Sequence, residues 1–320
     1  MANIVILDGY AANPGDLSWE PLKEFGTVTV YERTPADQII PRIREADYVY
    51  TNKVPLSREA IDSAPKLKWI GVLATGYNIV DIQYAREKGI PVSNVPAYSS
   101  ATVLQNVFAH LLHICHHVGD HAASVSKGKW AACQDFCFWD YPQIELEGKY
   151  MGIIGYGDIG KKVAKAALAF GMKLLIHTPH PEPSLETENL SFTDLDSLLE
   201  KSDVISLHCP LTPATSNMID QAALKKMKST AILINTGRGP LIDEDALAQA
   251  LNQGEIFAAG LDVLCQEPPQ KDNPLFQAKN CFISPHISWS SKEARIRLHQ
   301  VAFDNLRSFL EGRPVNIVNL

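Results

Sequence analysis

The sequence predicts an α/β protein with two parallel β-sheets, each covered by helices on both faces. Short apolar and β-branched runs alternate with helical patterns along most of the chain, which is typical of parallel sheets. One long helical segment interrupts this alternation after residue 98, and a second series of strands and helices then begins. In the second series, a glycine-rich turn lies between the first strand and the helix that follows it.

The first series occupies residues 1–98. Its expected strands are rich in aliphatic, β-branched and aromatic residues: Asn3–Leu7, Val28–Tyr31, Tyr48–Tyr50 and Trp69–Leu73. Helix-start signals lie between them, at Thr34-Pro35 and at Ser57. Pro41 predicts a kink or an early end in its helix, because proline lacks the N–H that a helix needs.

A single long helix is predicted over residues 99–127, where apolar residues recur at spacings of three and four. An irregular aromatic segment, residues 130–141, follows it. The helix also carries histidines at spacings that suit a metal ion, namely His110, His113, His117 and His121. Because neither an H-E-x-x-H motif nor an acidic third ligand accompanies them, we predict no metal site and expect a helix buried against a partner subunit.

The second series begins at Lys149. Its expected strands are Tyr150–Ile154, Lys173–Ile176, Val204–Leu207, Ala231–Ile234, Phe257–Leu261 and Cys281–Ile283. A last helix, residues 291–311, and a short apolar tail end the chain. We interpret the long helix and the last helix as the two crossings between domains. The expected domains are therefore residues 1–98, an inserted domain at 99–288, and residues 289–320, which complete the first domain.

Composition excludes several classes of function. The 320 residues carry 29 Lys and Arg against 36 Asp and Glu, a net charge of −7 that would repel nucleic acid. We find no basic leader and no apolar run that suits a membrane helix. Six cysteines without C-x2-C pairs indicate free thiols in a reducing cytoplasm. A zinc site at Cys133 and Cys137 is the competing interpretation, but a second ligand pair is missing.

The glycine-rich turn has the pattern G-x-G-x-x-G and comprises Gly155, Tyr156, Gly157, Asp158, Ile159 and Gly160. An apolar strand precedes it and an amphipathic helix follows it, which is the context that a dinucleotide-binding turn requires. Its glycines permit the turn, the approach of a pyrophosphate and the packing of helix on strand. A purely structural turn is the alternative.

The next strand ends without the acid that commonly binds the ribose of NAD. His177, Thr178, Pro179 and His180 occupy this position, and Glu182 is the first carboxylate. No Arg or Lys lies between Lys173 and Lys201 to bind the 2′-phosphate of NADP. The choice between NAD and NADP is therefore open, with NAD as the default and Thr178 as the expected contact.

Three polar residues follow later strands, at the sheet edge where parallel sheets bind ligands. They are Arg238, Glu267 and His286. Arg presents a fork of donors to a 2-keto acid, His can give a proton to its oxygen, and Glu can orient the imidazole. Taken singly, each could instead be a surface, turn or strand-end residue.

Motifs along nearly the whole chain resemble the D-isomer-specific 2-hydroxyacid dehydrogenase family. In the first domain they are L-A-T-G-Y-N-x-x-D (73–81) and N-V-P-A-Y-S (94–99). Later come G-Y-G-D-I-G (155–160), H-C-P-L-T-x-x-T (208–215), N-T-G-R-G (235–239), L-D-V-x-x-x-E-P-P (261–269) and P-H-I-S-W (285–289). The resemblance implies two Rossmann-like domains, with the coenzyme domain inserted into the substrate domain.

The resemblance also implies roles for individual residues. Arg238 would bind substrate, Glu267 would pair with His286, and His286 would be the acid/base. Backbone donors of the substrate-carboxylate loop would come from Ala74, Thr75 and Gly76. The implied cofactor contacts outside the glycine turn are Thr178, Cys209, Pro210, Thr215, Thr236, Arg238 and Asp262, the last near the nicotinamide amide.

Within the family, D-F-C-F-W-D (135–140) and P-H-x-x-W (285–289) are similar to the glycerate dehydrogenase, or hydroxypyruvate reductase, branch. This implies hydroxypyruvate and D-glycerate as the substrate pair, with glyoxylate or a bulkier 2-keto acid as the alternative. The branch implies a homodimer that uses the long helix and the following loop as an arm. A loop that serves packing or dimer contact is the alternative explanation of these motifs. A dinucleotide-sensing interaction protein, similar to the C-terminal-binding corepressors, is the alternative of a different class.

Overall fold

The computed structural model describes residues 1–319 and divides the chain into two compact units. The first unit combines residues 1–99 with the segment that begins at Trp289, and the second unit is residues 100–288. The chain passes between the units just before α5 (Ser100–His116) and shortly before α11 (Lys292–Leu310). Each unit contains a parallel sheet with helices on both faces, which confirms the predicted fold class.

The sheet of the first unit consists of β1 (Asn3–Ile6), β2 (Thr27–Val30), β3 (Tyr48–Thr51), β4 (Trp69–Val72) and β5 (Val92–Ser93). Their order is β2-β1-β3-β4-β5, and the strand pairings are parallel. β3 and β4 are buried along their whole length, because helices cover both faces. The sequence did not predict β5, which is too short for a recognisable strand pattern.

Two groups of helices cover the two faces of this sheet. The core on one face contains side chains of α2 (Ile39–Ile43), α3 (Arg58–Asp62) and α4 (Ile82–Glu87). The core on the other face contains side chains of α1 (Gly9–Ala12), the 3₁₀ turn Glu20–Glu24 and α11. A second 3₁₀ turn, Ala36–Gln38, leads into α2. Pro41 is tolerated in the first turn of α2, where its missing N–H costs no helical bond, and the helix ends two residues later.

The sheet of the second unit has seven strands in the order β12-β11-β10-β9-β6-β7-β8, with parallel pairings. Their bounds are Tyr150–Ile154 (β6), Lys173–His177 (β7), Leu190–Phe192 (β8), Val204–Leu207 (β9), Ile232–Asn235 (β10), Ala258–Leu261 (β11) and Cys281–Ile283 (β12). The sequence predicted all of them except β8. This edge strand is only three residues long, and polar residues flank it.

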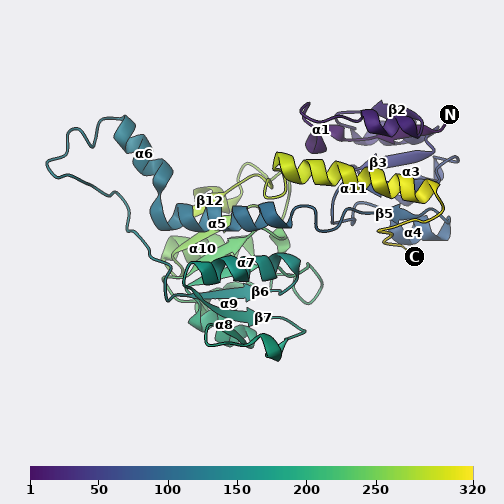
Figure 1. Ribbon diagram of the computed structural model, residues 1–320. Coiled ribbons are helices and arrows are strands. Elements are labelled where there is room, and N and C mark those ends of the chain that lie inside the picture. Colours follow the sequence, from purple (N-terminus) through teal and green to yellow (C-terminus); the bar gives the residue numbers. More distant parts are fainter. Residues whose placement is uncertain (320) are drawn as a thin grey trace. The chain divides into compact units, whose positions relative to one another are not determined.

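Helices again cover both faces of this second sheet (Figure 1). One face packs against α5 and α7 (Asp158–Ala169), whose apolar side chains form one core cluster. The other face packs against α8 (Leu195–Lys201), α9 (Gln221–Lys226) and α10 (Glu244–Gln253). Short 3₁₀ turns occur at Pro183–Leu185, Gly239–Leu241 and Pro274–Gln277. The apolar side chains of the strands and helices thus form two core layers, one on each face of this sheet.

The prediction of one continuous helix over residues 99–127 is wrong. α5 ends at His116, and α6 (Val118–Ser126) begins after a break at His117. The backbone of His117 is left-handed, with φ of 48°, which changes the direction of the chain. None of the side chains of α6 is buried. α6 and the loop after it extend away from the sheet of this unit, and we call residues 118–145 the arm (Figure 1).

Within residues 1–319, no helix combines the length and the apolar character that crossing a membrane would require.

Candidate active site

The glycine-rich turn joins β6 to α7. Gly155 has φ of 96°, and a Cβ there would lie 2.5 Å from the amide nitrogen of Cys209. A Cβ at Gly160 would lie 2.2 Å from the carbonyl oxygen of Gly155, so the helix can lie against the turn only with glycine there. A Cβ at Gly157 would meet nothing within 4 Å. The first and third glycines thus serve close packing, and the second leaves the backbone open to a ligand.

The N-terminus of α7 suits a phosphate. Gly157 is its N-cap and offers no side-chain hydrogen bond, so the first N–H groups of the helix lack a capping acceptor. Such groups and the helix dipole together attract an anion. The Asp158 carboxylate is already bonded to Lys162 and Ser100, and the bond from Lys162 is the main cause of its lowered pKa. Its negative charge is therefore partly neutralised at the helix end.

Thr236 supplies an independent test of whether the site fits a cofactor. Its side chain is 7% exposed, and its hydroxyl oxygen has no hydrogen-bond partner in the described part of the chain. A buried hydroxyl without a partner costs about 1–3 kcal/mol, which a bound ligand can offset. Thr236 directly follows β10, at the ligand-binding edge of the sheet. The site therefore fits the dinucleotide that the glycine turn indicates.

The loop after β9 carries three more of the predicted cofactor contacts. The Thr215 hydroxyl donates to the carbonyl of Pro210 at 2.7 Å and accepts from the amide of Thr212 at 2.8 Å. These bonds close the loop, so Thr215 positions Pro210. Burial raises the pKa of the Cys209 thiol, which lies 3.7 Å from the sulfur of Met218 and stays protonated. Direct cofactor contacts of these residues stay predictions.

A basic side chain from another part of the chain lies near the segment that follows β7. The sequence between Lys173 and Lys201 contains no basic residue of its own. Lys161, directly after Gly160, reaches Glu182 with 2.7 Å between Nζ and Oε1. Both side chains are about half exposed. Thr178 is half-buried, and its hydroxyl accepts a bond from the amide of His180. Because Lys161 comes from a different element, only the fold reveals that this charge is near.

Two members of the predicted trio are in direct contact. His286 Nδ1 lies 2.6 Å from Glu267 Oε2, and Glu267 Oε1 accepts a bond from the amide of Leu264 at 3.1 Å. Both side chains are partly exposed, by 26% and 33%. Because a carboxylate accepts hydrogen bonds, it holds the proton of the neutral ring on Nδ1. Any proton that the ring gives to a substrate would therefore pass through the other ring nitrogen, Nε2.

The backbone of His286 is left-handed, with φ of 53°, which is uncommon for a residue other than glycine. Asp262 holds this segment in place. Its Oδ1 accepts from the amide of Ile287 at 2.9 Å, and its Oδ2 accepts from the amide of Ser288 at 2.7 Å. Asp262 is 1% exposed, so these bonds are shielded from water. Its contact with the nicotinamide stays a prediction, and sequence reasoning missed its bonds to the His286 segment.

Arg238 lies in a loop that is fitted closely to the loop of Glu267. The Asn235 side chain accepts from the amide of Gly237 and donates to the carbonyl of Arg238, which fixes the turn after β10. The guanidinium Nη1 donates to the carbonyl of Gly237 at 2.8 Å, and the side chain is exposed. A Cβ at Gly239 would lie 2.0 Å from the carbonyl carbon of Leu264. Glycine thus allows the two loops to touch.

The predicted carboxylate loop, residues 74–76, belongs to the first unit. Asn94 Nδ2 donates to the carbonyl of Thr75 at 2.7 Å, and the Thr75 hydroxyl donates to the carbonyl of Val95 at 2.8 Å. Asn52 Nδ2 donates to the carbonyl of Leu73 at 2.8 Å. These bonds use carbonyls and the hydroxyl, and in the described chain none uses the N–H groups of residues 74–76. The loop therefore has donors to offer an anion.

Two other features lie apart from these residues. The break at His117 brings together possible ligand atoms of His113, His117 and Asp120, all within 4.8 Å of one another. Asp120 is the acidic third ligand that the sequence analysis stated to be missing, although its spacing of three residues from His117 is visible in the sequence. It already pairs with His117 Nδ1 at 2.9 Å. The His117 ring also stacks on Tyr141, with the ring centroids 4.1 Å apart. These contacts give the histidine a structural role, and the absence of a metal stays a prediction.

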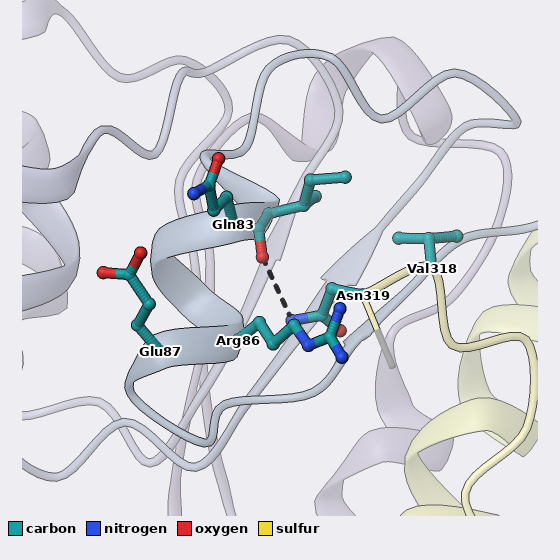
Figure 2. Close-up of a pocket in the computed structure, with 6 residues that line it drawn as sticks. Gln83, Arg86, Glu87, Val318 and Asn319 are labelled. Carbon is teal, nitrogen blue, oxygen red and sulfur yellow. Dashed lines mark hydrogen bonds between the residues drawn. The ribbon is translucent and has the colours of Figure 1, made fainter.

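A surface hollow lies between α4 and the C-terminal tail of the first unit (Figure 2). Gln83, Arg86 and Glu87 line it from the helix, and Val318 and Asn319 line it from the tail. Asn319 Nδ2 donates to the carbonyl of Ile82, which joins the two segments. None of the predicted site residues lines this hollow.

Comparisons with known proteins identify the family. Residues 108–288 match the family model described as D-isomer specific 2-hydroxyacid dehydrogenase, NAD binding domain. The chain belongs to this family. It is 54% identical over 319 residues to hydroxypyruvate reductase of Blautia hydrogenotrophica, with 99% of each chain covered. It is 43% identical over 291 residues to glycerate dehydrogenase of Methylorubrum extorquens, with 90% of each covered.

A solved structure of the same family supports the fold. D-lactate dehydrogenase of Aquifex aeolicus, complexed with NAD and lactic acid, superposes with a TM-score of 0.85 at 29% identity, and 99% of each chain is covered. The resemblance found in the sequence, including its branch, is thereby confirmed. The matched region contains the glycine turn, Arg238, Glu267 and His286, so the second unit contains the NAD-binding domain of this dehydrogenase.

Proposed function

We propose that this dehydrogenase reduces hydroxypyruvate to D-glycerate, and catalyses the reverse reaction, with Arg238, Glu267 and His286 as its catalytic residues. The observation that carries the proposal is the 2.6 Å contact between His286 and Glu267, beside a loop that presents Arg238. The names of the relatives at 54% and 43% identity support the choice of hydroxypyruvate. Glyoxylate and bulkier 2-keto acids are the alternative substrates.

The chemistry follows from the donors and acceptors of these side chains. When bound, the dinucleotide supplies the hydride that reaches C2 of the keto acid. The Arg238 fork binds the substrate carboxylate and the neighbouring keto oxygen through paired hydrogen bonds. His286 gives the proton on Nε2 to the keto oxygen as it becomes a hydroxyl. Glu267 holds the ring in place through its hydrogen bond with Nδ1.

The loop of residues 74–76 is also a substrate-binding element in this proposal. The N–H groups of Ala74, Thr75 and Gly76 donate to the substrate carboxylate, as backbone donors do at many anion sites. Support comes from the loop's hydrogen bonds, which engage the carbonyls of Leu73 and Thr75 and leave those N–H groups to a ligand.

The experiment that tests the proposed function is a turnover assay. NADH and NADPH oxidation is followed with hydroxypyruvate, glyoxylate, pyruvate and a bulkier 2-keto acid, each over a range of concentrations. We expect the highest kcat/KM with hydroxypyruvate. A higher value for glyoxylate or the bulkier acid would show that this acid, and not hydroxypyruvate, is the preferred substrate. Normal binding of NADH without turnover of any keto acid would instead favour a dinucleotide-sensing interaction protein.

We expect Thr178→Asp to increase the preference for NADH over NADPH. A carboxylate after β7 can accept a hydrogen bond from the ribose 2′-hydroxyl and repel a 2′-phosphate. One such bond is worth about 1 kcal/mol, so the ratio of the kcat/KM values should rise about fivefold. Parallel measurements with both cofactors check this.

Glu182→Gln serves as the comparison variant for Thr178→Asp. It removes the carboxylate that pairs with Lys161 and should move the ratio toward NADPH, because an unpaired ammonium attracts the 2′-phosphate. An unchanged ratio in Thr178→Asp would show that the ribose binds elsewhere.

We further propose a homodimer formed through the arm. Lys129 and Ser124 both bond the Asp140 carboxylate, and Trp130 Nε1 donates to the carbonyl of Phe136. The arm is thus organised by its own polar contacts, while Phe136 is 90% exposed and Trp139 is 70% exposed. Large exposed aromatic side chains on one segment are typical of protein interfaces. The occupant in this proposal is a second copy of the chain.

Replacing both aromatic residues, Phe136→Asp with Trp139→Glu, should convert the dimer to a monomer of 35.3 kDa, because burying charges at an apolar contact is unfavourable. Light scattering during gel filtration measures the mass. Ile296→Asp is the matched control, since Ile296 is an exposed apolar residue on α11, outside the arm. A dimer that persists in the double variant would exclude the arm as the interface.

We also infer a reducing, cytoplasmic location. All six cysteines are free, and two of them, Cys133 and Cys137, lie in the arm without forming a bridge. Nearby unpaired thiols are typical of proteins from a reducing compartment. Detection of the protein in the cytosolic fraction of its cell would support this inference, and recovery from an oxidising compartment would contradict it.

A further inference from the structure

His110 is a buried histidine that the proposed reaction does not use. It lies on α5 and is 9% exposed. Its ring passes over Gly260 of β11, where a Cβ would lie 2.8 Å from the Cβ of His110 and 3.0 Å from its Cγ. Any larger residue at 260 would displace the ring. Glycine at position 260 therefore leaves the space on the sheet that the His110 side chain occupies.

At that place, His110 contacts the segment that carries His286. His110 Nε2 lies 3.0 Å from the hydroxyl oxygen of Ser284, which is two residues before His286. The Ser284 hydroxyl itself donates to Asp262 Oδ1 at 2.5 Å. A hydroxyl has a single proton, so its oxygen must accept from His110. Nε2 therefore holds the ring proton of His110.

The burial of His110 agrees with this direction. Desolvation lowers the pKa of His110, which favours the neutral ring near pH 7. A neutral histidine has one N–H, and Ser284 fixes it on Nε2. The two hydrogen bonds therefore form a continuous chain, in which His110 donates to Ser284 and Ser284 donates to Asp262.

Asp262 connects this chain to the catalytic segment. Its two oxygens accept the amides of Ile287 and Ser288, directly after the left-handed His286. We propose that His110 is a positioning residue, which orients the Ser284 hydroxyl toward Asp262 and thereby holds His286 in its left-handed conformation. This inference rests on the proposed role of His286 in proton transfer.

A histidine that only fills space in the core is the competing explanation. Both explanations expect a loss of stability when His110 is replaced, so melting temperature alone does not separate them. Only a positioning role makes the effect of His110 on the rate depend on His286. The test is therefore a double-mutant cycle between the two residues, measured on the whole protein.

The first variant is His110→Phe, which keeps a ring of similar size and removes the donor. We expect kcat for hydroxypyruvate to fall about threefold to tenfold, as the loss of one hydrogen bond predicts. NADH affinity in a fluorescence titration should fall much less than kcat, because the glycine turn is intact and only the predicted contact of Asp262 with the nicotinamide is disturbed. His110→Gln retains an N–H donor and should recover most of the rate. His113→Phe, one turn further along α5 and outside the hydrogen-bond chain, is the matched control.

In the His286→Ala background, His110→Phe should cause no further loss of kcat, since the group that it positions is gone. Equal losses in both backgrounds would overturn the positioning role. If His286→Ala alone leaves kcat unchanged, His286 is not the proton donor, and the proposed mechanism fails together with the positioning role. If His286→Ala lowers kcat but the losses from His110→Phe are equal in both backgrounds, only the positioning role fails. Should His110→Phe not fold, Ser284→Ala breaks the same chain from the other side and must give the same non-additive result.

Discussion

Replacing His286 with alanine is expected to lower kcat for hydroxypyruvate reduction by about 10²–10⁴-fold, the usual contribution of a general acid. The variant loses the ring that Glu267 holds at 2.6 Å, and with it the proton donor for the keto oxygen. The glycine turn and Thr236 are untouched, so the dissociation constant for NADH should stay nearly the same. Steady-state kinetics and a fluorescence titration of NADH measure the two quantities.

His116→Ala is a suitable control for this experiment. His116 is an exposed histidine at the end of α5 and contacts Gln143 of the arm, so its loss should leave kcat unchanged. Full turnover in His286→Ala would remove this residue from the mechanism. A large loss of NADH binding would mean that the segment around residue 286 also shapes the cofactor site.

The sequence was sufficient to predict most of the fold. Apolar runs such as Met151–Ile154 and Val204–Leu207 are buried on both faces, so the core itself requires their pattern. β5 and β8 escaped prediction because two or three residues are too few to show a strand pattern, although both residues of β5 are buried. The break at His117 escaped for a different reason. Apolar spacing continues through it, and the contacts that stabilise the left-handed residue come from Asp120 and Tyr141.

In the candidate site, too, some features could be predicted from the sequence and others could not. Residues that directly follow strands could be proposed from the sequence, because parallel sheets bring the carboxyl ends of their strands to one edge. The contact between Glu267 and His286 agrees with that reasoning. Interactions that join distant elements could not be proposed in this way. Lys161 near Glu182 and His110 against Ser284 depend on how α7 and α5 lie on the sheet.

Arg238→Lys is expected to lower kcat/KM for hydroxypyruvate at least about tenfold, because losing one charge-assisted hydrogen bond costs about 1.5–3 kcal/mol. A lysine keeps the charge but offers a point donor in place of the planar fork that matches a carboxylate and its keto oxygen. The bond from Nη1 to the Gly237 carbonyl also fixes the orientation of the guanidinium, and a lysine cannot repeat that arrangement. Initial rates over a range of hydroxypyruvate concentrations measure the loss. Lys165→Arg, at an exposed position on α7, is a charge-preserving control. If the lysine variant matches the unmodified enzyme, the substrate carboxylate is bound by other groups, and the N–H donors of residues 74–76 become the main candidates.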